Sequence, residues 1–372
     1  MKVTINKNDI LPVLSKIQGL AGRKTNLAVT TSLLIQTEES GISIAATDLE
    51  TGFKGFYPAK IDAQGVIAIN ARKLYEIVRD FPSEDIYINE IENHWIEIGN
   101  QTVEYHIVSM NPDDFPEIPK IEDVDYFEIN SPFFAKMIER TAIITGAPDD
   151  NRAHVIAIFA ERIQEKNQKI FRLVSTDGSR LSKADCVFNK EFELPSGSDV
   201  LIPKKGLTEV AKFLDNQGSV KIGIKDNNFI VKKEKETLII RLLEGEFPQY
   251  GDIVVKTDGH DIPLDRQLFL MTLKRMSILS SDEYKGVIFH FNTDKLLINS
   301  TNPDIGESKE DMDISYKGDP VEVMYNPKFF IDTLGVIDDD NIILNIIDEE
   351  KPCKIKGEND KSFLSVIMPM RI

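Results

Sequence analysis

The sequence predicts an α+β protein made of three similar domains. A short motif occurs first as AATDLE, then as VSTDGSR and then as NSTNPD, and it places a threonine at Thr47, Thr176 and Thr301. This spacing is close to one third of the 372 residues. Two helix patterns recur at the same interval. Such a long period indicates copies of a whole domain, because the repeats of solenoid proteins are only about 20–50 residues long.

The first helix of each copy follows a short strand. Helices are expected over 6–17, 131–144 and 264–280, because their apolar residues recur at the three- and four-residue spacing of one helix face. Each has a residue at its start whose side-chain oxygen can accept a free backbone N–H, and these N-cap candidates are Asn6, Asn130 and Asp265. Basic residues occupy equivalent places in the three helices, at Lys16, Arg140 and Arg275.

The second helix of each copy is expected over 70–81, 203–214 and 326–337. A basic residue opens each copy, at Arg72, Lys204 and Lys328. Pro203 and Pro327 suit a first helical turn, where a missing N–H costs nothing.

The segments between the helices have the composition of antiparallel strands. Runs such as 43–45, 102–105, 219–222 and 237–243 are rich in β-branched and apolar residues and are interrupted by Asn, Asp and Gly. Two helices and many strands in each copy predict α+β domains with the helices on one face of the sheets. The predicted boundaries place the three domains at 1–124, 125–251 and 252–372.

Charge is distributed unevenly between helices and strands. The net charge is −17, yet the six helix segments together carry about +8, which leaves about −25 on the rest of the chain. At face value this net charge argues against a nucleic-acid partner, but if the helices share one surface, that surface is basic on an acidic body. The alternative is that Lys and Arg are simply good helix formers on solvated faces.

The sequence lacks the usual signs of an enzyme. The histidines and the two cysteines, Cys186 and Cys353, do not have metal-ligand spacing, and no phosphate-binding glycine loop or nucleophile elbow occurs. Acidic pairs such as 113–114 and 149–150 fit solvated turns better than a hydrolase with paired carboxylates. The repeated Thr-Asp also fits a turn, and we therefore expect no catalytic residue, metal or cofactor.

Several segments in order along the chain resemble one family. They are MKVTI at 1–5, ATDLE at 46–50, NARKLYEIVR at 70–79, STDGSRL at 175–181, PKKGLTEV at 203–210, EGEFPQY at 244–250, YKGV at 284–287 and MPMRI at 368–372. With these segments the whole chain resembles the beta subunits of bacterial DNA polymerase III, the sliding clamps.

The resemblance implies a cytoplasmic DNA-replication protein without catalytic activity. Two chains of the family pair head to tail, so that six domains form a ring around duplex DNA without reading its sequence. The helices line the central hole and the sheets form the outside. The expected function is that of a processivity factor, which tethers the polymerase III catalytic subunit. The clamp loader, other polymerases and repair proteins are further expected partners, bound through short peptide motifs. The main alternative is a three-domain peptide-binding scaffold without a DNA role.

Residues expected to contact DNA come from the resemblance and from the helix charges. The resemblance implies Arg23 and Arg72, and it places His154 where some relatives have an aromatic residue on single-stranded template. The neighbouring Ala153 cannot stack on a base. The helix pattern adds Lys73, Lys136, Arg140, Lys204, Lys212, Lys274, Arg275 and Lys328.

The resemblance also implies a partner-peptide cleft between the second and third domains. Its expected residues are Val155, Thr176, Gly178, Arg180, Leu181, Pro248, Ile253, Tyr284, Asn326, Phe329, Val366, Ile367, Met368, Pro369, Met370 and Arg371. Methionines suit a surface that accepts several ligands. Ser179 and Asp252 replace a histidine and an arginine of some relatives, and this change predicts a more acidic rim that prefers peptides with basic flanks.

The ring contact is expected to join the first domain of one chain to the third domain of the other. The resemblance places Tyr105 and Ile107 on one side and Ile278 and Leu279 on the other. Ordinary packing of these apolar residues in the core is the alternative.

Overall fold

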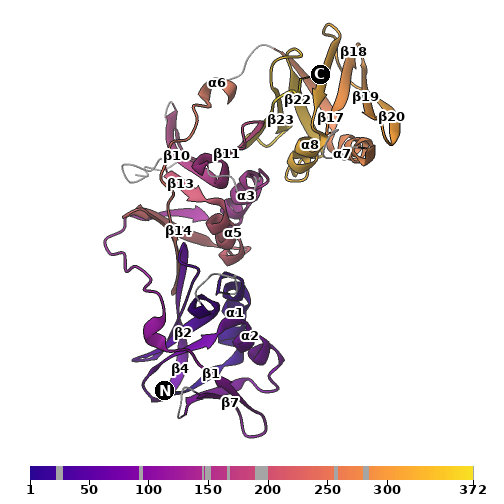
Figure 1. The fold of residues 1–372 in the computed structure, drawn as a ribbon. Helices are drawn as coiled ribbons and strands as arrows, with labels where there is room; N and C mark the ends of the chain where they lie inside the picture. The colour runs from indigo at the N-terminus through magenta and orange to yellow at the C-terminus, as the bar shows by residue number, and fades with distance from the viewer. Residues whose placement is uncertain are drawn as a thin grey trace. The chain divides into compact units, whose positions relative to one another are not determined.

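A computed structural model describes residues 1–21, 28–91, 95–144, 146, 152–165, 168–188, 200–254, 259–279 and 285–371. The described chain forms two compact units (Figure 1). The first unit contains Met1–Ala135 and Lys205–Leu242. The second unit contains the described residues within 136–204 and 243–372. Among the described residues, no helix has the length and apolar character needed to cross a membrane.

The first unit is built on an antiparallel sheet that has 12 strands among the described residues. Its main path runs β8-β7-β6-β1-β4-β16-β15-β14-β9, and β3, β2 and β5 branch from β4. The bounds are β1 Lys2–Asn6, β2 Ser32–Glu38, β3 Gly41–Thr47, β4 Thr51–Ala63, β5 Val66–Asn70, β6 Asp85–Glu90, β7 Trp95–Gly99, β8 Glu104–Val108, β9 Phe127–Asn130, β14 Ser219–Lys225, β15 Asn228–Lys233 and β16 Glu236–Arg241.

Three helices belong to this unit, although Lys204, the first residue of the last helix, belongs to the second unit. They are α1 (Lys7–Ala21), α2 (Ala71–Asp80) and α5 (Lys204–Phe213), with short 3₁₀ segments at Ala28–Thr31 and Pro112–Asp114. The helices α1 and α2 pack side by side. Asn70 caps α2, because its side chain accepts the Lys73 N–H at 3.0 Å. The buried face of α1 includes Ile10, Leu14 and Ile17.

The second unit has an 8-stranded and a 4-stranded antiparallel sheet in the described residues, ordered β13-β10-β11-β12-β24-β23-β22-β17 and β20-β19-β18-β21. The strands are β10 Ala157–Glu165, β11 Gln168–Thr176, β12 Arg180–Phe188, β13 Val200–Pro203, β17 His260–Asp265, β18 Val287–Asn292, β19 Lys295–Asn302, β20 Gly306–Asp313, β21 Val321–Tyr325, β22 Asn341–Ile346, β23 Cys353–Gly357 and β24 Phe363–Ile367. The helices are α3 (Ser131–Ala142, in this unit from Lys136), α4 (Ala153–Ile156), α6 (Gly251–Val254), α7 (Arg266–Met276), the 3₁₀ segment η4 (Ser277–Leu279) and α8 (Pro327–Leu334).

Main-chain pairing joins successive copies of the repeat. In the first unit β16 of the second copy pairs with β4 of the first, from Glu236↔Gly55 to Ile240↔Thr51. In the second unit β12 pairs with β24, including Leu181↔Val366. Each joint is therefore a continuous sheet rather than a contact between separate sheets.

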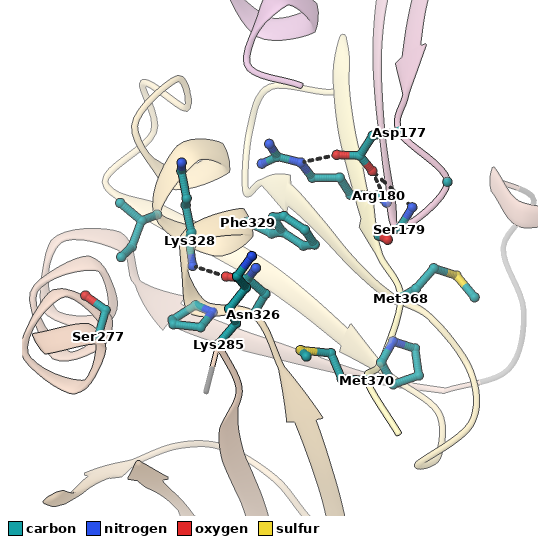
Figure 2. Close-up of a pocket in the computed structure, with 14 residues that line it drawn as sticks. Asp177, Ser179, Arg180, Ser277, Lys285, Asn326, Lys328, Phe329, Met368 and Met370 are labelled. Carbon is teal, nitrogen blue, oxygen red and sulfur yellow. Dashed lines mark hydrogen bonds and ion pairs between the residues drawn. The ribbon is translucent and has the colours of Figure 1, made fainter. Parts of the chain in front are cut away.

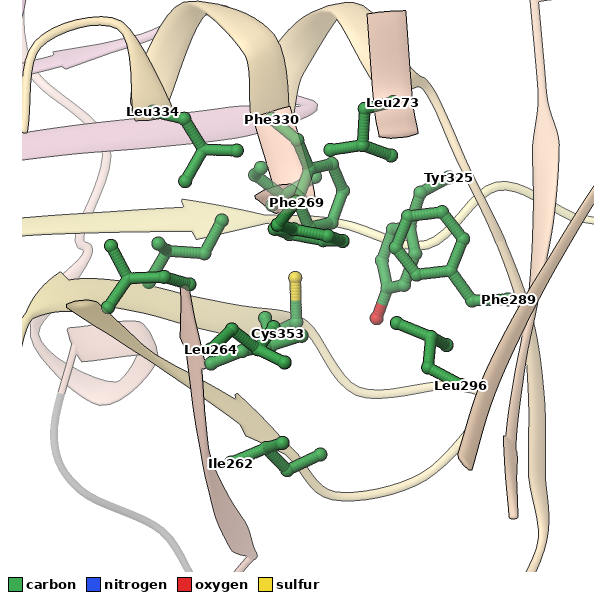
Figure 3. Close-up of a cluster of buried hydrophobic side chains, with 14 of the residues drawn as sticks. Ile262, Leu264, Phe269, Leu273, Phe289, Leu296, Tyr325, Phe330, Leu334 and Cys353 are labelled. Atoms are coloured by element: carbon green, nitrogen blue, oxygen red, sulfur yellow. The ribbon is translucent and has the colours of Figure 1, made fainter. Parts of the chain in front are cut away.

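A buried aromatic cluster holds the third copy together (Figure 3). The rings of Phe289 and Tyr325 each lie 5.2 Å from the ring of Phe330, measured between centroids, and Phe269 lies 6.0 Å from it. Full burial of one such side chain is worth about 1.5–3 kcal/mol. Cys353 lies in the same core, where burial raises the pKa of its thiol to about 12. A thiol that stays protonated has little reactivity.

The α+β class and the six expected helices are confirmed, with small shifts at their ends. Asn130 and Asp265 accept N–H groups of the next helix, as N-caps do. Pro203 is an exception, because it ends β13 instead of lying in the first turn of α5. Thr102 lies in a turn before β8, where its N–H donates to the Asn100 side chain.

Candidate peptide cleft and basic helix faces

The repeated motif forms a tight turn between β11 and β12, as predicted. The Thr176 hydroxyl donates to the Arg180 carbonyl at 2.8 Å and accepts the Gly178 N–H at 3.1 Å. The Asp177 carboxylate accepts the N–H groups of Ser179 and Arg180 at 3.0 and 3.1 Å. Gly178 has φ +91°, a conformation that glycine adopts without steric cost. In the third copy Asn302 accepts the Asp304 N–H in the same way, whereas the exposed Thr301 lies within β19.

Arg180 joins this turn to two other elements. Its side chain is 4% exposed and donates to Asp177 at 3.1 Å, to Asp332 of α8 at 2.8 Å and to the Ile143 carbonyl at 3.3 Å. The guanidinium also lies 4.3 Å from the centroid of the Phe329 ring, within the range of a cation–π interaction. Arg180 thus fixes the turn against the start of α8.

The C-terminal segment after β24 is held by backbone hydrogen bonds on both sides. The Met368 N–H donates to the Ser179 carbonyl at 2.9 Å, and the Met370 N–H donates to the Met324 carbonyl at 2.8 Å. Met368 and Met370 nevertheless remain 38% and 36% exposed. The segment is therefore a fixed wall with accessible methionines.

The turn, the start of α8 and the C-terminal segment enclose a cavity of ≈ 1020 Å³. Figure 2 shows Phe329 in the middle of the lining residues, with Arg180 and Asp177 on one side and Asn326 and Lys285 on the other. The lining residues are Asp177, Gly178, Ser179, Arg180, Ser277, Lys285, Asn326, Pro327, Lys328, Phe329, Ile331, Met368, Pro369 and Met370. They include seven of the expected cleft residues and place them in one hollow.

An apolar cluster adjoins this cavity through the same turn. Its buried members are Val174, Leu181, Tyr250 and Val366, with Phe159, Phe247, Val254 and Leu364 packed against them. Phe159 and Phe247 are stacked, with 4.7 Å between ring centroids. The expected residues Pro248 and Ile253 are exposed beside it, and Ile367 is buried in the core of the third copy.

A polar network lies next to this apolar cluster and was not expected from the sequence. Arg172 binds both carboxylate oxygens of Asp185, at 2.6 and 2.9 Å, and its guanidinium lies 3.5 Å from the Tyr250 hydroxyl. That hydroxyl donates to Glu161. Arg172 and Asp185 are 13 residues apart, so only the pairing of β11 with β12 brings them together.

Lys204 has a structural role. Its ammonium donates to the carbonyl groups of Ile144 and of Val155, the latter at 3.3 Å. Burial lowers the pKa of Lys204 to about 8, although the nearby Asp177 acts in the opposite direction. Val155, an expected cleft residue, is itself buried. Lys204 is therefore directed at backbone oxygens instead of solvent.

The basic residues of the first unit border a hollow of ≈ 500 Å³ on the helices. It is lined by Ser15, Lys16, Gln18, Gly19, Arg72, Tyr75, Glu76, Arg79 and Lys212. Arg72 and Lys73 both pair with Glu76 at 2.9 Å and stay largely exposed. Lys212 pairs with Glu209 at 3.0 Å. The charges of this hollow are predominantly positive.

In the second unit the expected DNA-contacting residues differ in exposure. Arg140 is buried at 5% exposure, pairs with Asp360 at 2.6 Å and donates to the Ser362 hydroxyl at 3.0 Å, so its guanidinium is engaged within the fold. Lys274 is exposed on α7. Arg275 pairs with Glu310 of β20, and this carboxylate raises the pKa of Arg275.

The remaining residues that were expected to contact DNA lie on different elements or outside the described residues. Lys136 pairs with Asp338 at 2.8 Å and with Glu139 at 3.1 Å. His154 is half-buried on α4. Lys328 lines the cavity beside α8. Arg23 and Tyr284 lie outside the described residues.

Two of the four expected ring-contact residues are exposed, and the other two are half-buried. Tyr105 and Ile107 belong to β8, the edge strand of the first sheet, and Tyr105 is 40% exposed. Ile278 is 75% exposed in η4, and Leu279 beside it is half-buried. Core packing therefore does not account for Tyr105 or Ile278. The sequence reasoning did not select Val108 and Ile305, which are 61% and 64% exposed.

Models of three domains of one protein match the chain in order. They describe the N-terminal, central and C-terminal domains of the DNA polymerase III beta subunit, and they match residues 1–119, 128–249 and 256–371. No cluster of residues suited to a metal ion occurs in the described part of the chain.

Relatives and solved structures of similar length agree with these matches. The beta sliding clamps of Chlamydia pneumoniae and Buchnera aphidicola are 26% and 27% identical, over 100% of this chain and 99% and 100% of theirs. The crystal structure of the DNA polymerase III subunit beta from Pseudomonas aeruginosa has a TM-score of 0.90 at 26% identity, with 100% of both chains covered. A DNA polymerase III beta subunit from Eubacterium rectale has a TM-score of 0.91 at 26% identity, again with 100% of both chains covered. The chain therefore belongs to the DNA polymerase III beta subunit family, the beta sliding clamps.

Proposed function

We propose that two copies of this clamp close head to tail around duplex DNA and tether the replicative polymerase to its template. The observation that carries this function is the match of three successive clamp-domain models to one chain. As a beta subunit, the chain is a non-catalytic accessory to DNA polymerase III. We assign the three domains to residues 1–124, 125–251 and 252–372. We also propose that the protein acts in the cytoplasm, where duplex DNA and the polymerase meet.

Basic residues of the helices, together with Arg23, are proposed to contact phosphates. The set comprises Arg23, Arg72, Lys73, Lys136, Lys212, Lys274 and Arg275, and the hollow of the first unit adds Lys16 and Arg79. His154 stays a candidate for template contact, whereas Arg140 and Lys204 serve the fold and Lys328 serves the cleft. Contacts with phosphates carry no sequence information, so a ring held by them can slide.

The cavity and the apolar cluster beside it are proposed to bind short peptides. The apolar cluster would take hydrophobic side chains, while the exposed Met368 and Met370 adapt to different partners. The partners are the polymerase III catalytic subunit, the clamp loader, other polymerases and repair proteins. Tethering raises the effective concentration of such a partner at the primer end without any new contact to DNA. One relative, from Pseudomonas aeruginosa, has been solved bound to griselimycin.

Apolar residues of β8 and η4, together with Ile305, are proposed to form the ring contact. Tyr105, Ile107 and Val108 would face Ile278, Leu279 and Ile305 of a second copy. Two equal contacts of this kind close a head-to-tail pair.

Retention on DNA tests the ring. The purified protein is loaded onto nicked circular DNA at low salt, washed at high salt, and compared with the same DNA after linearisation. A ring remains on the circle and slides off free ends, because salt weakens phosphate contacts but does not open the ring. Ile278→Asp is expected to abolish retention on the circle, since it places a charge in the apolar ring contact. Equal loss from circular and linear DNA would contradict the proposal and favour a scaffold without a DNA role.

A further inference from the structure

A row of polar side chains crosses the first sheet and ends at its free edge. Cross-strand pairing aligns Lys2 of β1, Asn89 of β6, Glu97 of β7 and His106 of β8. Residues that pair in this way place their side chains on the same face of the sheet. Among the described residues β8 pairs with β7 alone, so His106 is the last member of the row. The exposed His106 therefore faces whatever approaches this edge.

The charged groups around His106 in its own chain are mainly carboxylates. A carboxylate oxygen of Glu104 lies 3.1 Å from the His106 Nε2 atom. Glu97 faces His106 from β7 and accepts a hydrogen bond from the Tyr87 hydroxyl at 2.8 Å. This hydrogen bond is the main cause that lowers the pKa of Glu97, and the charge of Lys2 adds to it. With a neutral His106 this part of the edge thus has two carboxylates and one lysine.

The other side of the proposed ring contact is also acidic. Segment 304–313 contains the exposed Ile305 and continues as β20, which is an edge strand of its sheet and packs against η4. The segment has five acidic residues and a single lysine. A second copy therefore brings further negative charge towards β8.

Only part of this negative charge is neutralised within the chain. Arg275 binds Glu310, and Lys295 binds Asp311 at 2.7 Å. The other three carboxylates of the segment are exposed and form no ion pair with any described residue; they belong to Asp304, Glu307 and Asp313. Like charges that meet across a contact oppose association, so the two edges need an additional positive charge.

We infer that closing the ring contact takes up a proton at His106, so that two copies associate more tightly at pH 6 than at pH 8. The inference rests on the proposed ring contact. Histidine is the side chain that ordinarily changes charge between pH 5 and 8. Carboxylates that approach from a second copy favour the protonated imidazole, and by linkage the bound proton favours the contact to the same extent.

The dimer dissociation constant measured against pH tests the inference. Fluorescently labelled full-length protein is diluted at pH 6, 7 and 8 at constant ionic strength, and sedimentation gives each Kd. One exposed charge pair changes an equilibrium constant about threefold, and a ring has two equal contacts, so the Kd should be roughly tenfold lower at pH 6 than at pH 8. The difference should shrink as salt rises from about 50 to 500 mM. Unperturbed carboxylates titrate near pH 4, about two units below this range.

Variants of the histidine assign the effect. His106→Gln should keep the Kd that the wild type has at pH 8 and lose the pH dependence, whereas His106→Arg should associate tightly at both pH values. His260→Gln removes an exposed histidine of β17, outside the ring contact, and should keep the pH dependence. A contribution from Lys204, whose pKa is about 8, would remain in His106→Gln. The Tm of each variant at each pH shows that the fold is intact.

A variant of the opposite side tests the carboxylates. Asp304→Asn combined with Glu307→Gln should lower the Kd at pH 8 and weaken the pH dependence, because less negative charge then meets β8. An unchanged pH dependence in this double variant would contradict the inference that these carboxylates favour the proton.

The outcomes separate the inference from the function on which it rests. If no dimer forms at any pH, the proposed ring contact fails as well. If the dimer has the same Kd at pH 6 and pH 8, or is tighter at pH 8, the ring contact stands and the inference is overturned. If the pH dependence survives in His106→Gln, another group takes up the proton, and the assignment to His106 is overturned.

Discussion

The turns at 47–52 and 176–181 have the same main-chain design and different surroundings. In both, a threonine hydroxyl donates across the turn and an aspartate accepts two N–H groups: Asp48 accepts those of Glu50 and Thr51 at 3.2 and 2.8 Å. Both aspartates also meet a cation, but Asp48 binds Lys205 of α5 at 2.7 Å, whereas Asp177 binds Arg180 of its own turn. Arg180 also binds Asp332 of α8, whereas the second carboxylate bound by Lys205 is Glu50 of the same turn.

The residues that follow the aspartates have different neighbours in the two copies. Gly52 stands where the second copy has Leu181, and Ile118 approaches it so closely that an added Cβ would lie 2.9 Å from an Ile118 methyl carbon. In the second copy Leu181 instead packs with Tyr250 and Val366. At the first joint Ile118 lies against Gly52 beside a cavity of ≈ 410 Å³, whereas the cavity beside the second turn measures ≈ 1020 Å³. The repeated turn thus has the same main-chain structure in both copies, and the residues around it differ.

The largest expected difference in stability concerns Arg180 and Lys205, the two cations that bind the turn aspartates. Arg180→Ala should lower the free energy of unfolding by about 3 kcal/mol, because Asp177 and Asp332 would be left without their partner in a largely buried site. Lys205→Ala should cost less, about 1–2 kcal/mol, because the buried Asp48, at 1% exposure, keeps its hydrogen bonds from two N–H groups and Lys205 is itself 40% exposed. Urea unfolding measures both changes. Equal costs would show that the link to α8 adds no stability.

A smaller effect is expected where Ile118 closes the first joint. Gly52→Ala should destabilise the protein by about 1–2 kcal/mol, because the new methyl group overlaps Ile118. In the Ile118→Ala background the same change should cost much less, and a double-mutant cycle measures this coupling. Additive costs would mean that Ile118 does not fill the joint. Gly178→Ala serves for comparison. A Cβ at Gly178 has no neighbour within 4 Å, so its effect on stability reports the backbone conformation alone.

The smallest effect is expected at the left-handed position of each turn. Leu49 has φ +77° at the place of Gly178, and its side chain is 51% exposed. Leu49→Gly should therefore change stability by less than about 1 kcal/mol and in the stabilising direction, since strain is relieved and little packing is lost. Thermal unfolding should show a slightly raised Tm. A clearly lowered Tm would indicate that Leu49 packs against the joint in solution.

Local features of the sequence predicted the helices and turns well, because they depend on neighbouring residues. Asn70 and Asp265 cap the helices that follow them, and Asp177 accepts the N–H groups two and three residues on. The apolar spacing of α1 likewise determines which face is buried.

Side-chain roles that depend on distant residues could not be predicted in the same way. Arg140 has the spacing of an exposed helix residue, but Asp338 and Asp360 reach it from the third copy and bury it. Lys204 occupies the place of the exposed Arg72 and instead donates to two carbonyl groups. The charge of a residue is visible in the sequence, whereas the group that neutralises it is set by the fold.

The unpaired edge of β8 has a consequence for assembly. Within the described residues β8 pairs with β7 alone, so its other edge presents free backbone groups beside the exposed Tyr105 and Val108. Such an edge invites further strands. A head-to-tail contact made there ends after two copies only if their angle brings the chain ends together, and otherwise it continues as an open filament. The angle of that contact, more than its strength, would then separate a ring that slides from a polymer that does not.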